Sequence, residues 1–213
     1  MLEQSTSENA TKIMLFCITN SNLSTTYECI DRFINKLDYN CTIDDVYSVA
    51  PYNPPLLIRN LTHQFNFLGF ALYKGVLSEY LLPVINKCPT PLINKIIYNK
   101  DGGMNALEYA SRHYKHFSET ICQKFLEKGA KTSRLGYFLL QNKASIMTDN
   151  TIKWALNQGY ISPHDKLTIG KTTISLLEYA LQLKNKENSR EGPFSKRYGY
   201  LLENSQNSSN TLP

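Results

Sequence analysis

The chain has 213 residues, of which 42% are hydrophobic and 19% are charged, an ordinary balance for a globular protein that excludes disorder over the whole length. Its formal net charge of +5 is spread along the chain without a basic run, so charge alone does not indicate a nucleic-acid partner. No stretch approaches the roughly 18 uninterrupted apolar residues that a membrane-spanning helix needs.

The 5 cysteines stand at positions 17, 29, 41, 88 and 122, and no two of them form a C-x-x-C pair. An odd number of cysteines, set mostly in apolar helical patterns, is typical of reduced and buried thiols. The apolar run at 13–18 follows a polar, acidic segment, which favours a buried helix over a signal peptide. We therefore expect a cytosol-like, reducing compartment.

Apolar residues recur at intervals of three and four along most of the chain, and alternating β-branched runs are scarce, which predicts an all-α fold. Pro83 lies inside one expected helix and predicts a kink or a late helix start there. The expected helices form about five pairs, at 8–19 and 24–37, 61–74 and 77–87, 104–115 and 118–128, 134–144 and 149–158, and 173–185 and 193–204.

Two segments interrupt or end this helical pattern. Residues 41–60 contain Pro51, Pro54 and Pro55, which indicates a proline-rich insertion. Residues 204–213 are small and polar, which predicts a disordered tail. The remainder predicts a single helical-repeat domain over residues 1–203.

An internal repeat links several of the expected pairs. The sequence Leu-Glu-Tyr-Ala occurs at 107–110 and again at 177–180, a displacement of two periods of about 35 residues, and Leu-Gly-Phe-Ala occurs earlier at 68–71. Gly129 and Gly159 each follow an amphipathic segment and are predicted to end a second helix. The spacing indicates stacked helix pairs.

The segment 105–110, Asn-Ala-Leu-Glu-Tyr-Ala, followed by 125–130, Phe-Leu-Glu-Lys-Gly-Ala, resembles the ankyrin repeat, and 155–159 is a weaker match. The leucine, alanine and glycine positions of the family are kept. Its Thr, Pro and His positions are occupied by Asn105, Ala106 and Glu108 in one repeat, and by residues 175, 176 and 178 in another. The resemblance spans residues 61–185 and implies a short, irregular solenoid, with an unrelated α-solenoid or a helical bundle as open alternatives.

No phosphate-binding loop, nucleophile elbow or H-E-x-x-H motif occurs, which disfavours an enzyme, and no cofactor is predicted. The nearest approach to a metal-ligand set is His113, His116 and Cys122, with Cys88 as a fourth candidate. Because this spacing matches no zinc motif, we expect the histidines to flank a solvated turn and Cys122 to pack in the core, without a metal. An enzyme with an unrecognised Cys/His site stays open as an alternative.

Tyrosine is abundant and lies near several expected helix ends. Tyrosine side chains there either anchor a protein partner or cover a thin core, and both interpretations stay open. The tyrosines in question are Tyr73, Tyr98, Tyr109, Tyr114, Tyr137 and Tyr160.

The resemblance to ankyrin repeats implies a protein–protein interaction module that binds through a concave face and the inter-helix turns. Basic side chains in the turns favour a partner with an acidic surface. Nucleic acid is a weaker alternative because acidic residues dilute this charge. The expected contact residues are Lys100, Asp101, Arg112, Lys131, Arg134, His164 and Lys166.

High usage of Asn, Lys and Ile, together with the polar end at Thr211-Leu212-Pro213, resembles the effectors that intracellular bacteria inject into host cells. That resemblance implies a host protein as the partner and secretion into the host cell. Parasites and viruses that carry ankyrin proteins share the same compositional bias.

Overall fold

The computed structural model of the chain describes residues 7–20, 23–39, 65–98, 103–142, 146–187 and 192–209. Most of this part is helical, as predicted, and it also contains one small two-stranded sheet. The chain gathers into two compact units, residues 1–110 with 123–131 and residues 111–122 with 132–213.

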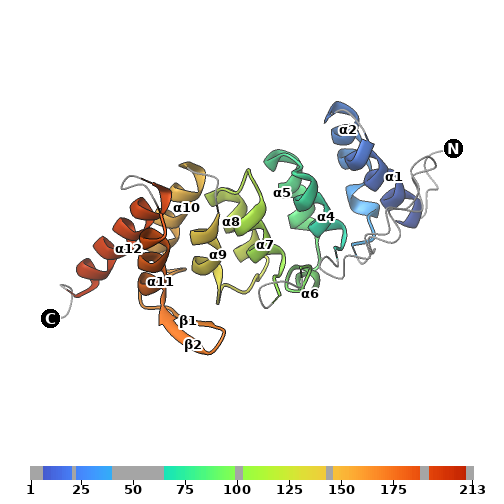
Figure 1. Cartoon of the computed structure of the whole chain (residues 1–213). Helices are drawn as coiled ribbons and strands as arrows, with labels where there is room; N and C mark the ends of the chain where they lie inside the picture. The colour runs from blue at the N-terminus through green and yellow to red at the C-terminus, as the bar shows by residue number, and fades with distance from the viewer. Residues whose placement is uncertain are drawn as a thin grey trace. The chain divides into compact units, whose positions relative to one another are not determined.

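The first unit begins with α1 (Ser7–Asn20) and α2 (Leu23–Phe33), which pack against each other, and the 3-10 turn η1 (Ile34–Lys36) (Figure 1). A second pair follows, α4 (Phe67–Lys74) and α5 (Ser78–Lys87), and then the short helix α6 (Thr90–Ile93). The unit also takes the residues of α7 (Ala106–His113) up to 110 and those of α8 (Glu119–Glu127) from 123. Its fully buried side chains include Met14, Ile30, Phe67, Leu81, Ile85 and Phe125.

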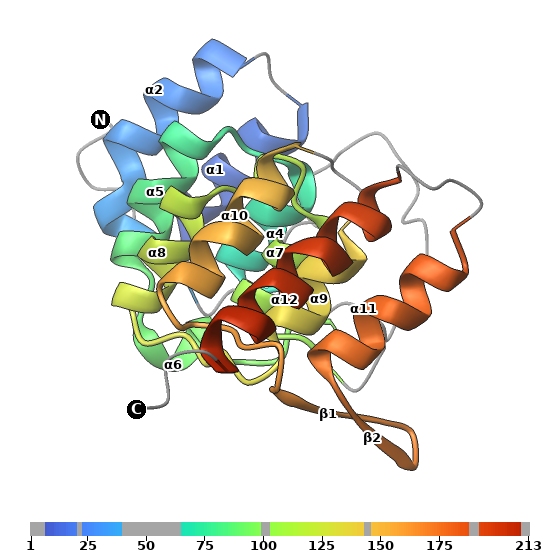
Figure 2. The same ribbon diagram turned by 90° about the vertical axis from the view of Figure 1, so that its left-hand side faces the viewer.

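The second unit contains the other residues of α7 and α8, the helices α9 (Leu135–Gln141) and α10 (Ile146–Asn157), the strands β1 (Lys166–Ile169) and β2 (Thr172–Ser175), and the helices α11 (Leu176–Asn185) and α12 (Pro193–Ser209). Helix α12 packs on α10 and α11, and α9 packs on the same two helices. The antiparallel β1–β2 hairpin projects from the start of α11 (Figures 1 and 2). Phe117, Ile121, Phe138, Leu139, Ile152 and Leu201 lie in the core of this unit.

Most predicted helices agree with the structure within a few residues. Helix α5 begins at Ser78 and continues through Pro83, so the predicted late start is wrong. Helix α12 continues beyond its buried anchor Leu201 to Ser209, within the segment 204–213 that was predicted as a disordered tail. The predicted insertion at 41–60 and the predicted helical residues 61–64 lie outside the described residues.

The two glycines predicted to end second helices do so through the same hydrogen bonds. Gly129 has a φ of 77° and Gly159 a φ of 71°, both in the left-handed region that favours glycine. The Gly129 N–H donates to the carbonyl of Leu126 (2.9 Å), and the next N–H donates to Phe125 (3.0 Å); the chain at 159–160 repeats this arrangement. These paired bonds are a Schellman motif, so the predicted C-caps are confirmed.

The starts of two first helices are also built alike. At α7, the Glu108 N–H donates to Asn105 Oδ1 (3.0 Å), and the Asn105 N–H donates to Glu108 Oε2 (3.0 Å). Ser175 and Glu178 form the same reciprocal pair at α11. Each is a capping box, in which Asn or Ser is followed by Glu three residues later.

An unpredicted β segment precedes each of these starts, a strand before α11 and an isolated bridge before α7. Residues 173–175, predicted as helix, belong to β2, and Gly170 turns the hairpin with a φ of 63°. Before α7, Tyr98 and Met104 pair in an isolated antiparallel bridge. The helical period of the following residues masked the short β segment, because four residues are too few to show a period of two.

Candidate interaction surface

An aromatic residue occupies the same position in each first helix from α4 onward. The pattern Leu-x-aromatic occurs at 68–70 in α4, 107–109 in α7, 135–137 in α9 and 177–179 in α11. The residue after it, Ala71, Ala110, Phe138 or Ala180, is buried in every case. The helices therefore hold the aromatic ring beside the core rather than at random on the surface.

In the first unit these rings form a cluster that we call the aromatic face, consisting of Phe65, Phe70, Tyr73, Tyr98 and Tyr109. Phe65 lies at its centre, with its ring centroid 5.2 Å from that of Tyr73 and 5.4 Å from that of Tyr109. Tyr73 also lies 6.5 Å from Phe70, and Tyr98 lies 5.7 Å from Tyr109. Such tilted and edge-on contacts are the favourable geometries for aromatic pairs.

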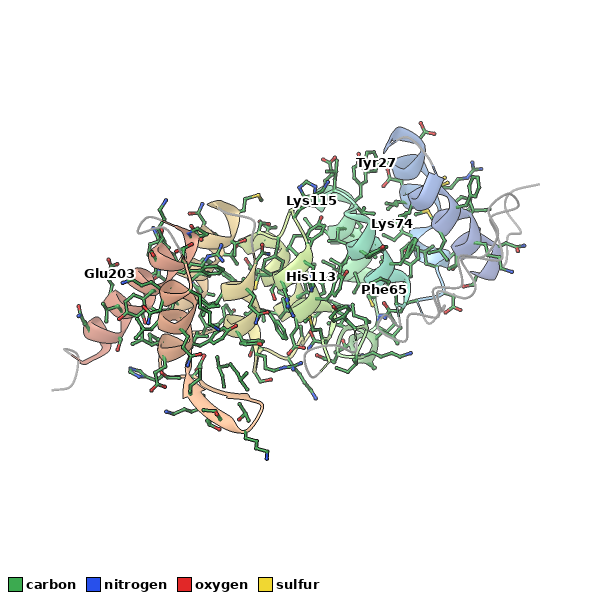
Figure 3. All side chains as sticks on the ribbon, in the orientation of Figure 1. Tyr27, Phe65, Lys74, His113, Lys115 and Glu203 are labelled. Carbon is green, nitrogen blue, oxygen red and sulfur yellow. The ribbon has the colours of Figure 1, made fainter. Side chains whose placement is uncertain are left out.

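The aromatic face runs from the core to the surface. Phe65, Phe70 and Tyr109 are buried, Tyr98 is half-buried, and Tyr73 is 55% exposed, the most exposed of the large hydrophobic side chains in the described part. Lys74, the last residue of α4, places its Nζ 5.4 Å from the Phe70 ring centroid and 5.7 Å from that of Tyr73. Figure 3 labels Phe65 and Lys74, which stand before and at the end of α4. At the surface end of the aromatic face, the Tyr73 ring therefore lies beside the Lys74 cation.

The phenols of the aromatic face influence one another electrostatically. Burial raises the pKa of Tyr109, and the nearby phenols of Tyr73 and Tyr98 raise it further, because a second phenolate would be repelled. The Tyr109 hydroxyl therefore keeps its proton at physiological pH.

The second unit contains a related pair of tyrosine rings, both of which are half-buried. The rings of Tyr137 in α9 and Tyr179 in α11 lie 4.9 Å apart, and Gln141 Nε2 donates to the Tyr179 hydroxyl at 2.8 Å. The pKa of Tyr179 is raised to about 12, mainly by burial, and the nearby Arg112 acts in the opposite direction. Here the tyrosine tip is already engaged within the protein.

The expected contact residues fall in different places. Lys100 and Asp101 lie outside the described residues. Lys131, in the first unit, has an exposed side chain, and its N–H donates to Asn94 Oδ1 at 2.8 Å. Asn94 Nδ2 in turn donates to the carbonyl of Gly129 at 2.9 Å, so one side chain fixes the turn after α8.

The other expected contact residues belong to the second unit. Arg134 places its guanidinium 5.1 Å from the Phe138 ring centroid, and Arg112 lies in the last turn of α7. His164 and Lys166 are exposed and lie together at the base of the hairpin, where Lys166 pairs with Ser175. Lys166 also contributes to lowering the pKa of Glu178, so its charge is partly balanced within the protein.

Burial controls the ionisation of Cys88, Cys122 and His116. Burial raises the pKa of Cys88 and of Cys122 to about 12, which keeps both as thiols, and Cys122 lies in the core as predicted. The pKa of His116 is lowered by burial and by Lys115. Among the residues that the structure describes, no three His, Cys, Asp or Glu side chains gather to hold a metal ion.

The second unit also contains a buried charge that the sequence analysis missed. Arg197 of α12 is completely buried, and its Nε donates to Asp149 Oδ1 of α10 at 2.8 Å. Its Nη1 donates to the carbonyls of Leu140 (3.1 Å) and Asn142 (2.6 Å) at the end of α9. One side chain therefore joins three helices and satisfies carbonyl groups that α9 leaves open.

Comparison with known proteins found no match to a family model, to a curated protein or to a solved structure. The described helices include none that is long and apolar enough to cross a membrane.

Phe65, Phe70 and Lys74 were not predicted as members of an interaction site. The repeated Leu-x-aromatic pattern was visible in the sequence and would have placed Phe70, Tyr109, Tyr137 and Tyr179 in equivalent positions. Nothing in the local sequence separates the exposed Tyr73 from the buried Tyr114, since that difference depends on which helices pack around each ring.

Proposed function

We propose that the chain is a protein-interaction module and that the aromatic face of its first unit is the main contact surface. The observation that carries the proposal is Tyr73, which is 55% exposed although its ring rests on Phe65 and Phe70. A large, pre-ordered ring loses little conformational freedom on binding. Tyrosine held in this way is favoured at protein interfaces.

The partner that fits this surface is a protein segment with both apolar and acidic side chains. Apolar groups would pack on the rings of Tyr73 and Tyr98, and a carboxylate would pair with Lys74. The net charge of +5 favours approach of such a segment. The expected contact residues Lys131, Arg134, His164 and Lys166 would add secondary contacts to an acidic partner.

The test is comparative affinity capture from a eukaryotic lysate, with the wild-type chain, Tyr73→Ala and Lys74→Glu as baits. Tyr160→Ala is the matched control, because Tyr160 is also an exposed tyrosine, 40% accessible, but stands in the turn after α10 and outside the aromatic face. We expect one set of proteins to be retained by wild type and Tyr160→Ala and lost, by about tenfold or more, from the other two baits.

Equal retention on all four baits would contradict the proposed surface. In that case, charge reversal at Lys131, Arg134 and Lys166 tests whether the partner binds the turns instead of the aromatic face. These residues lie in turns or at the hairpin. Retention on generic DNA or RNA that falls steeply with salt would instead favour the nucleic-acid alternative.

We further propose that the helix pairs stack as a short ankyrin-like solenoid. The support is local: two capping boxes, two Schellman motifs at Gly129 and Gly159, and a β segment before α7 and before α11. Small-angle X-ray scattering tests the arrangement, since a stack is longer than a globule. A radius of gyration near that of a compact 213-residue protein, about 17 Å, would contradict it.

We also propose that the chain acts inside a host cell as a secreted effector, which is supported by composition alone. Fusion of the chain to a reporter that is active only in host cytosol tests this. A reporter signal during infection with the native source, and none from a secretion-deficient strain, is the expected result. Absence of signal in both would contradict it.

A further inference from the structure

Two cysteines of the first helix pair lie in direct contact. Cys17 is on α1 and Cys29 is on α2, and the Cys17 Sγ donates a hydrogen bond to the Cys29 Sγ at 3.3 Å. Helices α1 and α2 pack side by side in the first unit (Figure 1). The two sulfurs are therefore held together by the fold and do not require a large rearrangement to meet.

The two cysteines differ in how accessible they are to solvent. Cys17 is 6% exposed, whereas Cys29 is half-buried. Cys88 and Cys122, by contrast, are completely buried, and each lies far from the first pair in sequence. A reagent in solution reaches Cys29 first.

We propose that Cys17 and Cys29 are a redox-active pair that forms a reversible disulfide between α1 and α2 when the chain meets a small-molecule disulfide such as oxidised glutathione. The Cys29 thiolate attacks one glutathione sulfur, which forms a mixed disulfide and releases the other glutathione as a thiolate. The Cys17 thiolate then attacks the Cys29 sulfur and releases the second glutathione. Two protein thiols are oxidised, one glutathione disulfide is reduced, and the two protons pass to the released thiolates.

The surroundings of Cys29 determine the rate of the first step. The pKa of Cys29 is raised to about 11, first by burial, then by the Cys17 thiol and by Glu28, while Arg32 acts in the opposite direction. Because the thiolate is the attacking species, the reaction is slow at neutral pH and faster at alkaline pH. The raised pKa of Cys29 therefore slows oxidation of the pair at neutral pH, although the two sulfurs already lie in contact.

The disulfide would link positions 17 and 29 and hold α1 and α2 together when they would otherwise separate. The other end of the pair is already tied, because the Asp38 N–H donates to Thr11 Oγ1 of α1 at 2.7 Å. Amide exchange in α1 and α2 is expected to slow on the order of tenfold or more after oxidation.

The experiment incubates the full chain with a graded ratio of oxidised to reduced glutathione, blocks remaining thiols with a maleimide, and digests with trypsin. Both cysteines then lie in the tryptic peptide 13–32. Further cleavage after Glu28 leaves two fragments that only a Cys17–Cys29 disulfide joins. We expect mass spectrometry to find the joined fragments, with Cys88 and Cys122 unlinked, and the same product in Cys41→Ser.

The single variant Cys17→Ser supplies a sharper readout, since it leaves Cys29 without its resolving partner. It should accumulate a stable glutathione adduct on Cys29, where the wild-type chain passes on to the internal disulfide. The proposal is overturned if Cys29 links to Cys41 instead, or if peptide 13–32 carries two maleimides even in fully oxidised glutathione at pH 9.

Discussion

The two units build helix starts with the same hydrogen bonds but bury them differently. The capping box of α7, Asn105 with Glu108, is buried in the first unit, whereas that of α11, Ser175 with Glu178, is exposed in the second. Of the two aromatic side chains Tyr73 and Tyr179, the exposed one lies in the first unit and the enclosed one in the second. Tyr73 in the first unit is open to solvent, while Tyr179 in the second is held by Gln141.

This contrast separates side chains that hold a unit together from side chains that remain available to a partner. In the second unit, Arg197 joins α9, α10 and α12 through hydrogen bonds within the protein. The first unit relies more on apolar contacts, and at the surface end of its aromatic face it exposes the Tyr73 ring beside the Lys74 ammonium. We therefore expect substitutions in the second unit to cost stability and substitutions at Tyr73 to cost binding.

The largest expected effect on stability is that of Arg197→Ala. It leaves Asp149 and the carbonyls of Leu140 and Asn142 without their buried donor, which should destabilise the second unit by about 3–5 kcal/mol. Fluorescence of Trp154, the one tryptophan in the sequence, reports urea unfolding of this unit. The control Lys196→Ala changes the exposed neighbour on α12, and a similar loss there would contradict the assigned role of Arg197.

Replacement of the two N-caps compares the buried and exposed capping boxes directly. Asn105→Ala leaves a buried N–H of Glu108 unsatisfied and should cost about 1–3 kcal/mol. Ser175→Ala exposes the equivalent N–H to water and should cost about 1 kcal/mol or less. Chemical denaturation of both variants measures the difference. Equal losses would show that burial does not distinguish the two boxes.

A tight contact in the second unit provides a third comparison. A Cβ added to Gly136 of α9 would meet Leu176 Cδ2 at 2.6 Å, so α9 and the start of α11 need glycine there to approach. Overpacking should outweigh the better helix propensity of alanine and leave Gly136→Ala destabilised by about 1 kcal/mol. Gly199→Ala is the control, because a Cβ at Gly199 of α12 meets no atom within 4 Å. Stabilisation of both variants would refute the close approach.

The smallest expected effect is the pH dependence of the exposed capping box. Hydrogen bonds from the backbone and hydroxyl of Ser175 lower the pKa of Glu178 below its ordinary 4.5, so the box stabilises α11 above that pH. This contribution is lost as the pH falls through the lower pKa of the folded state. The Ser175 amide resonance should follow that titration in NMR spectra, and Glu178→Gln should abolish the shift. A titration at or above pH 4.5 would be the contrary result.

Sequence periodicity was sufficient for the helices because their buried stripes are local. The amphipathic spacing around Ile121 and Phe125 and the glycines at 129 and 159 predicted where α8 and α10 end. The Leu-Glu-Tyr-Ala sequence stands at the start of both α7 and α11, and each copy begins with a capping box that the repeat spacing did not predict.

Other features depend on residues far apart in the sequence. Arg197 is buried because α9 and α10 supply acceptors more than 40 positions away, and no local pattern distinguishes it from a surface arginine. The exposure of Tyr73 and the contact of Cys17 with Cys29 have the same origin in tertiary packing. The hairpin is a local feature. Gly170-Lys171 is a turn signal present in the sequence, but the helical period of the residues after it masked the two four-residue strands.

The most direct test of the proposed surface is tyrosine-selective chemical modification of the chain, alone and in complex with a captured partner. Tyr73 and Tyr160 are each the only tyrosine of their tryptic peptides, 60–74 and 154–166, so both are read in one digest. The account predicts that the partner protects Tyr73 and leaves Tyr160 as reactive as in the free chain. Full reactivity of Tyr73 in the complex would show that the aromatic face is not the binding surface.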